Sequence, residues 1–196
     1  MKVVLLAGGY GTRIPEESIN KPKPMIEIGD MPIIWHIMKI YSYYGFTDFI
    51  ICAGYKQRMI KEWFSNYNIY NSDVTFHYGK NGTSCEIHKQ YGEEWNVTIV
   101  DTGLDTSTGG RIKRVQSYIG DKPFFMTYGD GLCDVNINEL LKFHKNHGKI
   151  ATLTSVRRNQ TKGVISITED NSVRAFREKS IVDGVPINAG YMVLNP

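Results

Sequence analysis

Glycine, arginine and lysine residues gather near the N-terminus, directly after an apolar run. The segment LLAGGYGTRIPEESINKPKPM, residues 5–25, contains three glycines, Arg13, and the lysines Lys21 and Lys23 set between prolines. Glycines let backbone N–H groups approach a phosphate closely, and a guanidinium offers a planar fork to phosphate oxygens. The prolines bias the lysines towards extended backbone, which leaves them little freedom to lose on binding an anion. This combination favours a cradle for a triphosphate.

The same residues allow plainer interpretations. A glycine-rich turn is also a tight exit from a strand, and lysines between prolines also form a rigid, solvated linker. The pattern is not a Walker A loop, because no Gly-Lys-Ser/Thr follows it, and Ile14 stands where a dinucleotide fingerprint would have its third glycine. From the residues alone, the cradle and the ordinary turn and linker both remain open.

Three further groups are candidates for a ligand site. Asp130 follows the apolar run PFFMTYG, and its carboxylate is the hard oxygen donor that Mg²⁺ prefers; an aspartate after glycine is also a common turn residue. The segment TSTGGR, residues 106–111, offers hydroxyls and an arginine, or is a flexible connection. His144 and His147 are three residues apart on a predicted helix without a third metal ligand, so we expect them on the helix surface.

Composition restricts the classes of function. The 196 residues are 41% hydrophobic and 22% charged, as in a globular protein with a sizeable core. A net charge of +3 is too small to indicate nucleic-acid or membrane binding. The 3 cysteines contain no CxxC pair, which is typical of a reducing compartment, and we expect a cytoplasmic protein. No apolar run approaches the roughly 18 residues of a membrane span.

Alternating strands and helices must position these groups. We expect helices at 31–45, 55–67, 110–119 and 136–148, and strands at 2–7, 49–54, 73–78, 96–101, 123–130, 150–156, 163–168, 173–179 and 188–194. The polar segment 79–95 is predicted to connect two strands, and the last strands to pair as hairpins. The alternation predicts an α/β fold with a mostly parallel sheet, mixed at its C-terminal side, and helices on both faces. Ligands bind at the carboxyl ends of such strands, where the glycine loop stands.

Two motifs make the sequence recognisable as a family member. LAGGYGTR followed by KPKPM resembles the signature of the sugar-1-phosphate nucleotidyltransferases, and WHIMK, WNVTIVDTG and TGGRIKRV are similar to the cytidylyl branch of that family. Similar blocks cover most of residues 1–150 and then thin out. The resemblance implies a Rossmann-like nucleotidyltransferase fold. It also implies Mg²⁺-dependent transfer of a cytidylyl group from CTP to glucose 1-phosphate, giving CDP-glucose and pyrophosphate for deoxysugar and lipopolysaccharide O-antigen synthesis.

The resemblance also implies roles for individual residues. Arg13 would stabilise the departing pyrophosphate, Lys23 would face the α-phosphate, and Asp130 would hold Mg²⁺. The residues implied in nucleotide binding are Leu6, Ala7, Gly8, Gly9, Gly11, Thr12, Thr106, Gly110, Arg111 and Gly129. Those implied in binding the sugar phosphate are Gly163, Glu178, Lys179, Asn188 and Gly190. Ser180 replaces the proline that usually follows the glutamate and lysine of this family's sugar motif, which puts the sugar-side geometry in doubt.

The remaining expectations concern how much of the family's domain this chain contains and which partners the protein has. We expect residues 1–196 to form a single nucleotidyltransferase domain that lacks the family's C-terminal segment, and with it the second metal-binding aspartate. The full-length protein is expected to be a homo-oligomer without nucleic-acid or membrane partners. Two alternatives stay open: transfer from dTTP, UTP or GTP instead of CTP, and a nucleotide-binding fragment that does not turn over.

Overall fold

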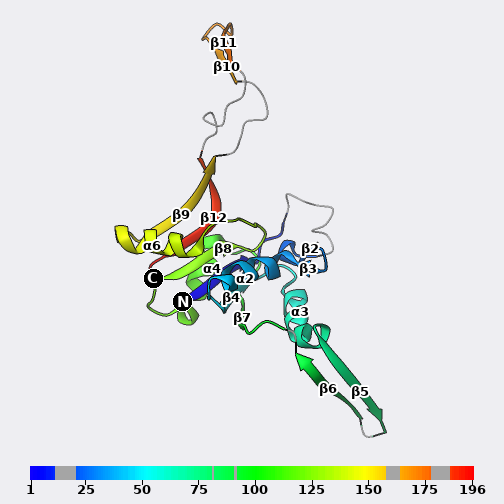
Figure 1. Ribbon diagram of the computed structural model, residues 1–196. Coiled ribbons are helices and arrows are strands. Elements are labelled where there is room, and N and C mark those ends of the chain that lie inside the picture. The colour runs from blue at the N-terminus through cyan, green and yellow to red at the C-terminus, as the bar shows by residue number, and fades with distance from the viewer. Residues whose placement is uncertain (12–20, 81, 91, 158–163, 178–185) are drawn as a thin grey trace.

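A computed structural model describes residues 1–11, 21–80, 82–90, 92–157, 164–177 and 186–196. Its centre is a six-stranded sheet with helices packed on both faces (Figure 1). Among the described residues, no helix is both long and apolar enough to cross a membrane. The central sheet with helices on both faces confirms the mixed α/β architecture predicted from the alternating pattern.

The order of the strands across the sheet places β1 in the interior. From one edge to the other the strands are β7 (Asn96–Asp101), β4 (Asp48–Ala53), β1 (Lys2–Ala7), β8 (Phe124–Tyr128), β12 (Pro186–Leu194) and β9 (Ala151–Arg157). The first four run parallel, and β12 is antiparallel to both of its neighbours. The chain thus builds outward from β1 on one side and then crosses back to β8 on the other. Such a reversal leaves a crevice at the carboxyl ends of the two strands.

Two hydrophobic cores hold the helices against the sheet. One face of β1, with Val3 and Leu5, packs against apolar residues of α2 (Ile33–Tyr43), α3 (Gln57–Tyr70) and α6 (Ile137–His147). The opposite face, with Val4, packs against Val115 and Ile119 of the segment formed by α4 (Thr108–Arg114) and α5 (Gln116–Ile119). Both cores are fully closed around β1, which makes this strand a rigid base for the loop that follows it.

Local sequence accounts for several of the helix ends. Pro32 precedes α2, where its missing N–H costs nothing. The Asn136 side chain caps α6 by accepting a hydrogen bond from the Glu139 N–H, and Gly148 ends the helix in the left-handed conformation. The short elements η1 (Lys23–Met25), β2 (Glu27–Ile28) and β3 (Met31–Pro32) connect the N-terminal segment to α2.

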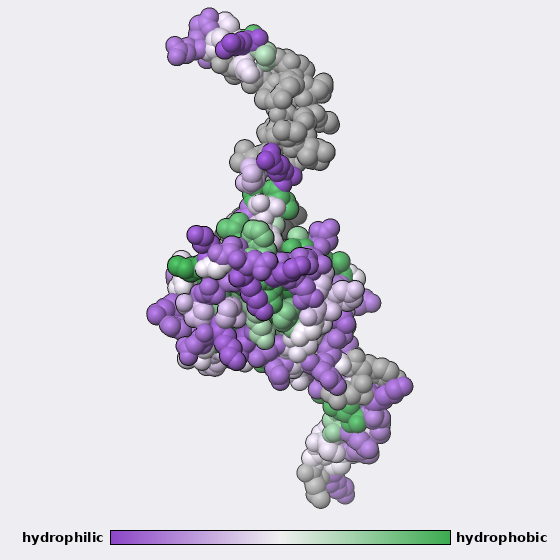
Figure 2. All heavy atoms as spheres, turned by 60° about the vertical axis from the view of Figure 1, so that its left-hand side comes forward, coloured by the Kyte–Doolittle hydropathy of each residue, from purple (hydrophilic) through white to green (hydrophobic). Residues whose placement is uncertain are grey.

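One predicted connection is wrong. Residues 79–95 do not simply link two strands, because they contain β6 (Gly82–Gln90), which pairs with β5 (Ser72–Gly79) in a separate hairpin. Phe76, Tyr78 and Ile87 are exposed on this hairpin, and Figure 2 shows hydrophobic side chains on its surface. The strand β6 is polar and buries neither face, so it lacks the alternation that marks a strand in sequence. A second hairpin joins β10 (Val164–Ile167) and β11 (Val173–Arg177), as expected, whereas β12 enters the main sheet.

The register of the strands brings the candidate loops together at the carboxyl ends of the strands. Ala7 is paired with Ala53, which is paired in turn with Asp101, while Leu6 is paired with Tyr128. Four parallel strands therefore end at the same level, and the loops at 8–11, 54–56, 102–107 and 129–131 meet there.

Candidate functional site

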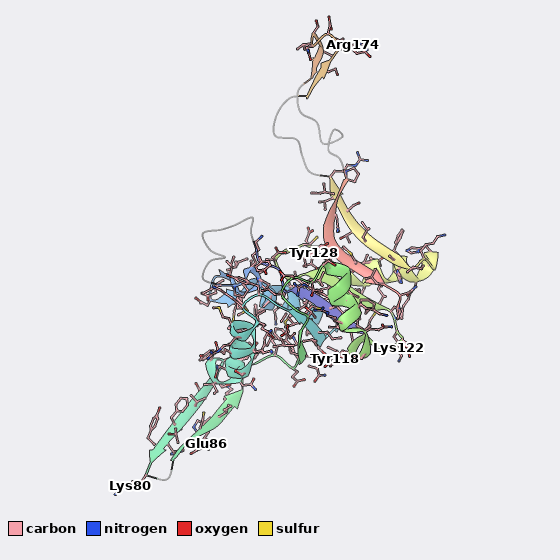
Figure 3. All side chains as sticks on the ribbon, turned by 180° about the vertical axis from the view of Figure 1, so that it is seen from behind. Lys80, Glu86, Tyr118, Lys122, Tyr128 and Arg174 are labelled. Atoms are coloured by element: carbon pink, nitrogen blue, oxygen red, sulfur yellow. The ribbon has the colours of Figure 1, made fainter. Side chains whose placement is uncertain are left out.

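A cavity of about 310 Å³ lies where these loops meet. It is lined by Leu6, Ala7, Gly8, Gly9, Gly11, Lys23, Pro24, Thr106, Ser107, Thr108, Arg111, Tyr128 and Asp130. Tyr128, labelled in Figure 3, stands at the end of β8, beside the crevice that the strand order predicts. Backbone, hydroxyl, cationic and carboxylate groups thus surround one polar space.

The glycine loop is shaped by an arginine behind it. A Cβ atom at Gly8 would lie 2.1 Å from Nη1 of Arg111, so any side chain here would have to displace the hydrogen-bonded guanidinium. On the other side, the Gly129 N–H donates to the Leu6 carbonyl at 3.0 Å, which ties the end of β8 to β1. The bare backbone of the loop therefore reflects close packing of the cavity wall as well as access for a ligand.

Arg111 is a buried cross-link between three strand ends. Its side chain is 5% exposed. Its guanidinium donates to oxygens of Gly8 (3.0 Å), Ala53 (3.4 Å), Thr102 (2.7 Å), Gly103 (2.7 Å) and Leu104 (3.0 Å). Burial lowers the pKa of this guanidinium, since no carboxylate among its hydrogen-bond partners offsets the loss of water. The five protein oxygens instead satisfy its donors, so Arg111 fixes the loops after β1, β4 and β7 relative to one another.

The two lysines of the extended segment have different surroundings. The Lys23 side chain is 14% exposed, lines the cavity, and places Nζ 3.6 Å from Oδ2 of Asp130. Lys21 instead pairs with Glu27 at 2.6 Å, and both of those side chains are exposed. Of these two lysines, Lys23 is the one whose positive charge lies at the cavity.

Asp130 is the carboxylate of the cavity. Its side chain is 43% exposed, and within the described part of the chain its one ion pair is the long one to Lys23. No cluster of three or more histidine, cysteine, aspartate or glutamate side chains occurs within the described ranges. A divalent ion at Asp130 would need oxygens from a substrate and from water, which is how Mg²⁺ is commonly held with one or two carboxylates. The residues present fit such an ion.

Asn188 and Gly190 lie behind Tyr128 and do not line the cavity. Gly190 has a φ of +88°, and a Cβ atom there would lie 3.0 Å from Cδ2 of Tyr128. The Asn188 side chain accepts a hydrogen bond from the Gly190 N–H at 2.8 Å, and the Tyr191 hydroxyl donates to the Gly131 carbonyl at 3.2 Å. This part of β12 therefore supports the end of β8 from the side.

The structure brings together most of the described candidates. Leu6, Ala7, Gly8, Gly9, Gly11, Lys23, Thr106, Arg111 and Asp130 line the cavity, whereas Gly110, Gly129, Asn188 and Gly190 stand beside it. Thr12, Arg13, Gly163, Glu178 and Lys179 lie outside the described residues. The sequence interpretation missed Pro24 and Tyr128, and it included Ser107 and Thr108 only as part of the 106–111 segment. Pro24 follows Lys23 and Tyr128 precedes Gly129, so position within the motif was the available signal.

The histidine prediction is wrong in one respect. His144 is 2% exposed, and its ring nitrogens lie 2.8 Å from Thr152 Oγ1 and 3.1 Å from Asn195 Oδ1. His147 also contacts Thr152 Oγ1, at 2.6 Å. The pair thus joins α6 to β9 by hydrogen bonds, and His144 is a core residue.

Comparison with known proteins places this geometry in context. A family model described as nucleotidyl transferase matches residues 2–183. The glucose-1-phosphate cytidylyltransferase of Salmonella typhi is 54% identical over 197 residues, spanning 100% of this chain and 76% of the relative. The alignment with the crystal structure of HddC from Yersinia pseudotuberculosis covers 99% of this chain and 76% of the HddC chain, at a TM-score of 0.66 and 22% identity. The alignment with the structure of a UDP-glucose pyrophosphorylase complexed with UDP-glucose covers 100% of this chain and 76% of the pyrophosphorylase chain, at a TM-score of 0.65 and 19% identity. These two structural similarities confirm the Rossmann-like fold.

Proposed function

The chain belongs to the nucleotidyl transferase family, and on that premise we propose that it transfers a cytidylyl group from CTP to glucose 1-phosphate. The products are CDP-glucose and pyrophosphate. The name of the Salmonella typhi relative supports the choice of both substrates. The main observation behind the proposal is that the glycine-loop backbone, Lys23 and Asp130 line the same cavity at the carboxyl ends of β1 and β8.

The reaction requires that the two substrates be positioned and that phosphate charge be neutralised. An oxygen of the sugar phosphate forms a bond to the α-phosphorus of CTP, and the bond from that phosphorus to the bridging oxygen breaks as pyrophosphate leaves. The attacking oxygen is already an anion at neutral pH, so no general base is required. Lys23 would neutralise charge on the α-phosphate, and the backbone at Gly8–Gly11 would hold the triphosphate.

A Mg²⁺ ion would bind at Asp130 together with oxygens of the triphosphate. When bound, such an ion neutralises phosphate charge and orients the phosphate chain. Asp130 itself accepts no proton in the reaction; its part is to hold charge opposite Lys23 at the end of β8.

The remaining roles are assigned by the family pattern. We propose that Thr106, Gly110 and Arg111 form the base and ribose side and that Arg13 and Thr12 serve the phosphates, with Arg13 acting on the departing pyrophosphate. Gly163, Glu178, Lys179, Asn188 and Gly190 are proposed to serve the sugar phosphate. Residues 1–196 are proposed to act as one nucleotidyltransferase domain within a homo-oligomeric cytoplasmic enzyme that supplies CDP-glucose to deoxysugar and O-antigen synthesis.

A turnover screen tests the proposal. Full-length protein is assayed for pyrophosphate release with glucose 1-phosphate, Mg²⁺, and each of CTP, UTP, dTTP and GTP. We expect kcat/KM for CTP to exceed the others by about tenfold or more, which corresponds to about 1.4 kcal/mol in the transition state. An equal or higher kcat/KM with another triphosphate overturns the choice of base. Binding of CTP without any turnover would favour a non-catalytic nucleotide-binding module.

A further inference from the structure

A hydrogen bond joins two loops at the rim of the cavity. The Tyr10 hydroxyl, at the tip of the glycine loop, donates to Oδ1 of Asp105 at 2.7 Å. Neither side chain lines the cavity, but their chain neighbours Gly9, Gly11 and Thr106 do. The Tyr10–Asp105 pair therefore connects the two walls between which a ligand would lie, without occupying the space itself.

The Tyr10 ring is also supported from the third loop. Its centroid lies 5.5 Å from that of Tyr55, with the rings tilted by 44°. The Tyr55 N–H donates to the Gly8 carbonyl at 3.1 Å, and the Lys56 ammonium stands 5.4 Å from the centre of the Tyr55 ring. Lys56 adopts a φ of +48°, a left-handed conformation that a lysine rarely takes. Strained positions of this kind tend to occur where geometry matters for function.

The chemistry of the pair keeps it intact at neutral pH. The hydrogen bond to Asp105, followed by slight burial and the negative charge of that carboxylate, raises the pKa of the Tyr10 hydroxyl. The hydroxyl therefore remains protonated and able to donate. A hydrogen bond from a neutral donor to a carboxylate is also stronger than one between two neutral groups.

The rim contact complements the buried one made by Arg111. Nη2 of Arg111 donates to the Gly8 carbonyl and to the Leu104 carbonyl, both at 3.0 Å, so it joins the same two loops at their base. Arg114 holds the same loop from the α4 side, because its Nη1 donates to the Thr102 carbonyl and, at 2.7 Å, to Thr106 Oγ1. Neither of those bonds involves the glycine loop, so the Tyr10–Asp105 contact adds at the rim the connection between the two loops that Arg111 makes at the base.

We propose that Tyr10 and Asp105 are positioning residues that set the spacing between the glycine loop and the Thr106–Thr108 segment across the cavity. The coupling of the two loops is a property of the free protein. Its consequence for nucleotide binding rests on the proposed function. With the pair intact, the hydroxyls of Thr106, Ser107 and Thr108 are held at a fixed distance from the backbone of Gly8–Gly11 before a nucleotide arrives.

Hydrogen exchange of the free full-length protein tests the coupling. We compare wild type with Tyr10→Phe, which keeps the ring beside Tyr55, with Asp105→Ala, which removes the acceptor, and with the double variant. Backbone amides of residues 103–108 should exchange about fivefold faster in each variant, the factor expected for loss of one hydrogen bond. The double variant should resemble the single ones, and the amides of β1 should be unchanged. Tyr43→Phe is the control, because Tyr43 is 85% exposed on α2 and distant from the cavity lining.

Steady-state kinetics tests the consequence. The KM for CTP should rise about five- to tenfold in Tyr10→Phe and Asp105→Ala while kcat changes less than twofold, since the pair positions the loops and does not touch the reacting atoms. Unchanged exchange at 103–108 overturns the coupling, and faster exchange with an unchanged KM overturns the positioning role. If wild type turns over no triphosphate, the proposed function fails, and the exchange comparison still decides whether the pair couples the loops.

Discussion

Lys23 and Asp130 face each other across the cavity, with Nζ 3.6 Å from Oδ2. Lys23 is the first residue of η1 and lies between Pro22 and Pro24, and Asp130 lies just after the end of β8. At this separation the two charges attract without forming a close hydrogen-bonded pair. Both therefore remain available to a ligand that brings phosphate oxygens to the ammonium and a divalent ion to the carboxylate.

Replacing Lys23 should affect catalysis far more than replacing Lys21. We expect Lys23→Ala to lower kcat about a hundredfold, because it removes a preorganised charge from the site where phosphate charge develops. Lys21→Ala is the matched control, since Lys21 pairs with Glu27 at 2.6 Å and does not line the cavity. Initial rates of pyrophosphate release measure both variants. Equal losses in the two would show that the roles have been assigned wrongly.

Asp130 should make nucleotide binding depend on Mg²⁺. We expect calorimetry to show tighter CTP binding with Mg²⁺ than without it in wild type, and the same affinity under both conditions in Asp130→Asn. The amide keeps the shape of the carboxylate but loses its charge. Asp121→Asn provides the control, because Asp121 is exposed and precedes β8, at the opposite edge of the sheet. A Mg²⁺ effect that survives in Asp130→Asn would place the ion elsewhere.

Arg111 should stabilise the fold as well as the cavity. A lysine at this position has three donors in place of a planar fork, so it would leave several buried carbonyls without a partner. We expect Arg111→Lys to lower the free energy of unfolding by about 2 kcal/mol. Urea denaturation followed by tryptophan fluorescence gives the value.

Arg58→Lys is the corresponding control for that measurement. The Arg58 side chain is 88% exposed, and its ion pair is with Glu62 on the same helix. Its substitution should change the free energy of unfolding by less than about 0.5 kcal/mol. Equal stability of the two variants would mean that the hydrogen bonds of Arg111 contribute little.

The cysteines should differ sharply in reactivity. Cys52 on β4 is buried, and burial raises its pKa to about 12, so at pH 8 the thiol is protonated as well as inaccessible. Cys85 on the β5–β6 hairpin is exposed. We expect iodoacetamide to alkylate Cys85 in the native protein and Cys52 only after unfolding in urea, as peptide mass spectrometry would show. Early alkylation of Cys52 would mean that the core between β4 and α5 opens readily.

Sequence alone determined the features that depend on near neighbours in the chain. The glycine loop after β1, Asp130 at the end of β8, and the Gly148 end of α6 all follow from local propensity and spacing, whereas Asn136 and Asn138 were both possible caps for α6 and the structure shows Asn136 in that place. The mostly parallel sheet follows as well, because strands separated by helices can return to a sheet only by a crossover. The family motifs added the identity of the cavity residues, including the choice of Lys23 over Lys21.

Tertiary structure decided what depends on strand order and on side chains far apart in the sequence. The motif placed Arg111 at the nucleotide site, but its hydrogen bonds to oxygens at the ends of β1, β4 and β7 could be seen only in the tertiary structure. His144 is buried because β9 passes beside α6 and supplies Thr152. Tyr10 meets Asp105 only because β7 and β1 end at the same level on either side of β4. Periodicity and propensity describe each element by itself, whereas these contacts are set by how the sheet arranges elements relative to one another.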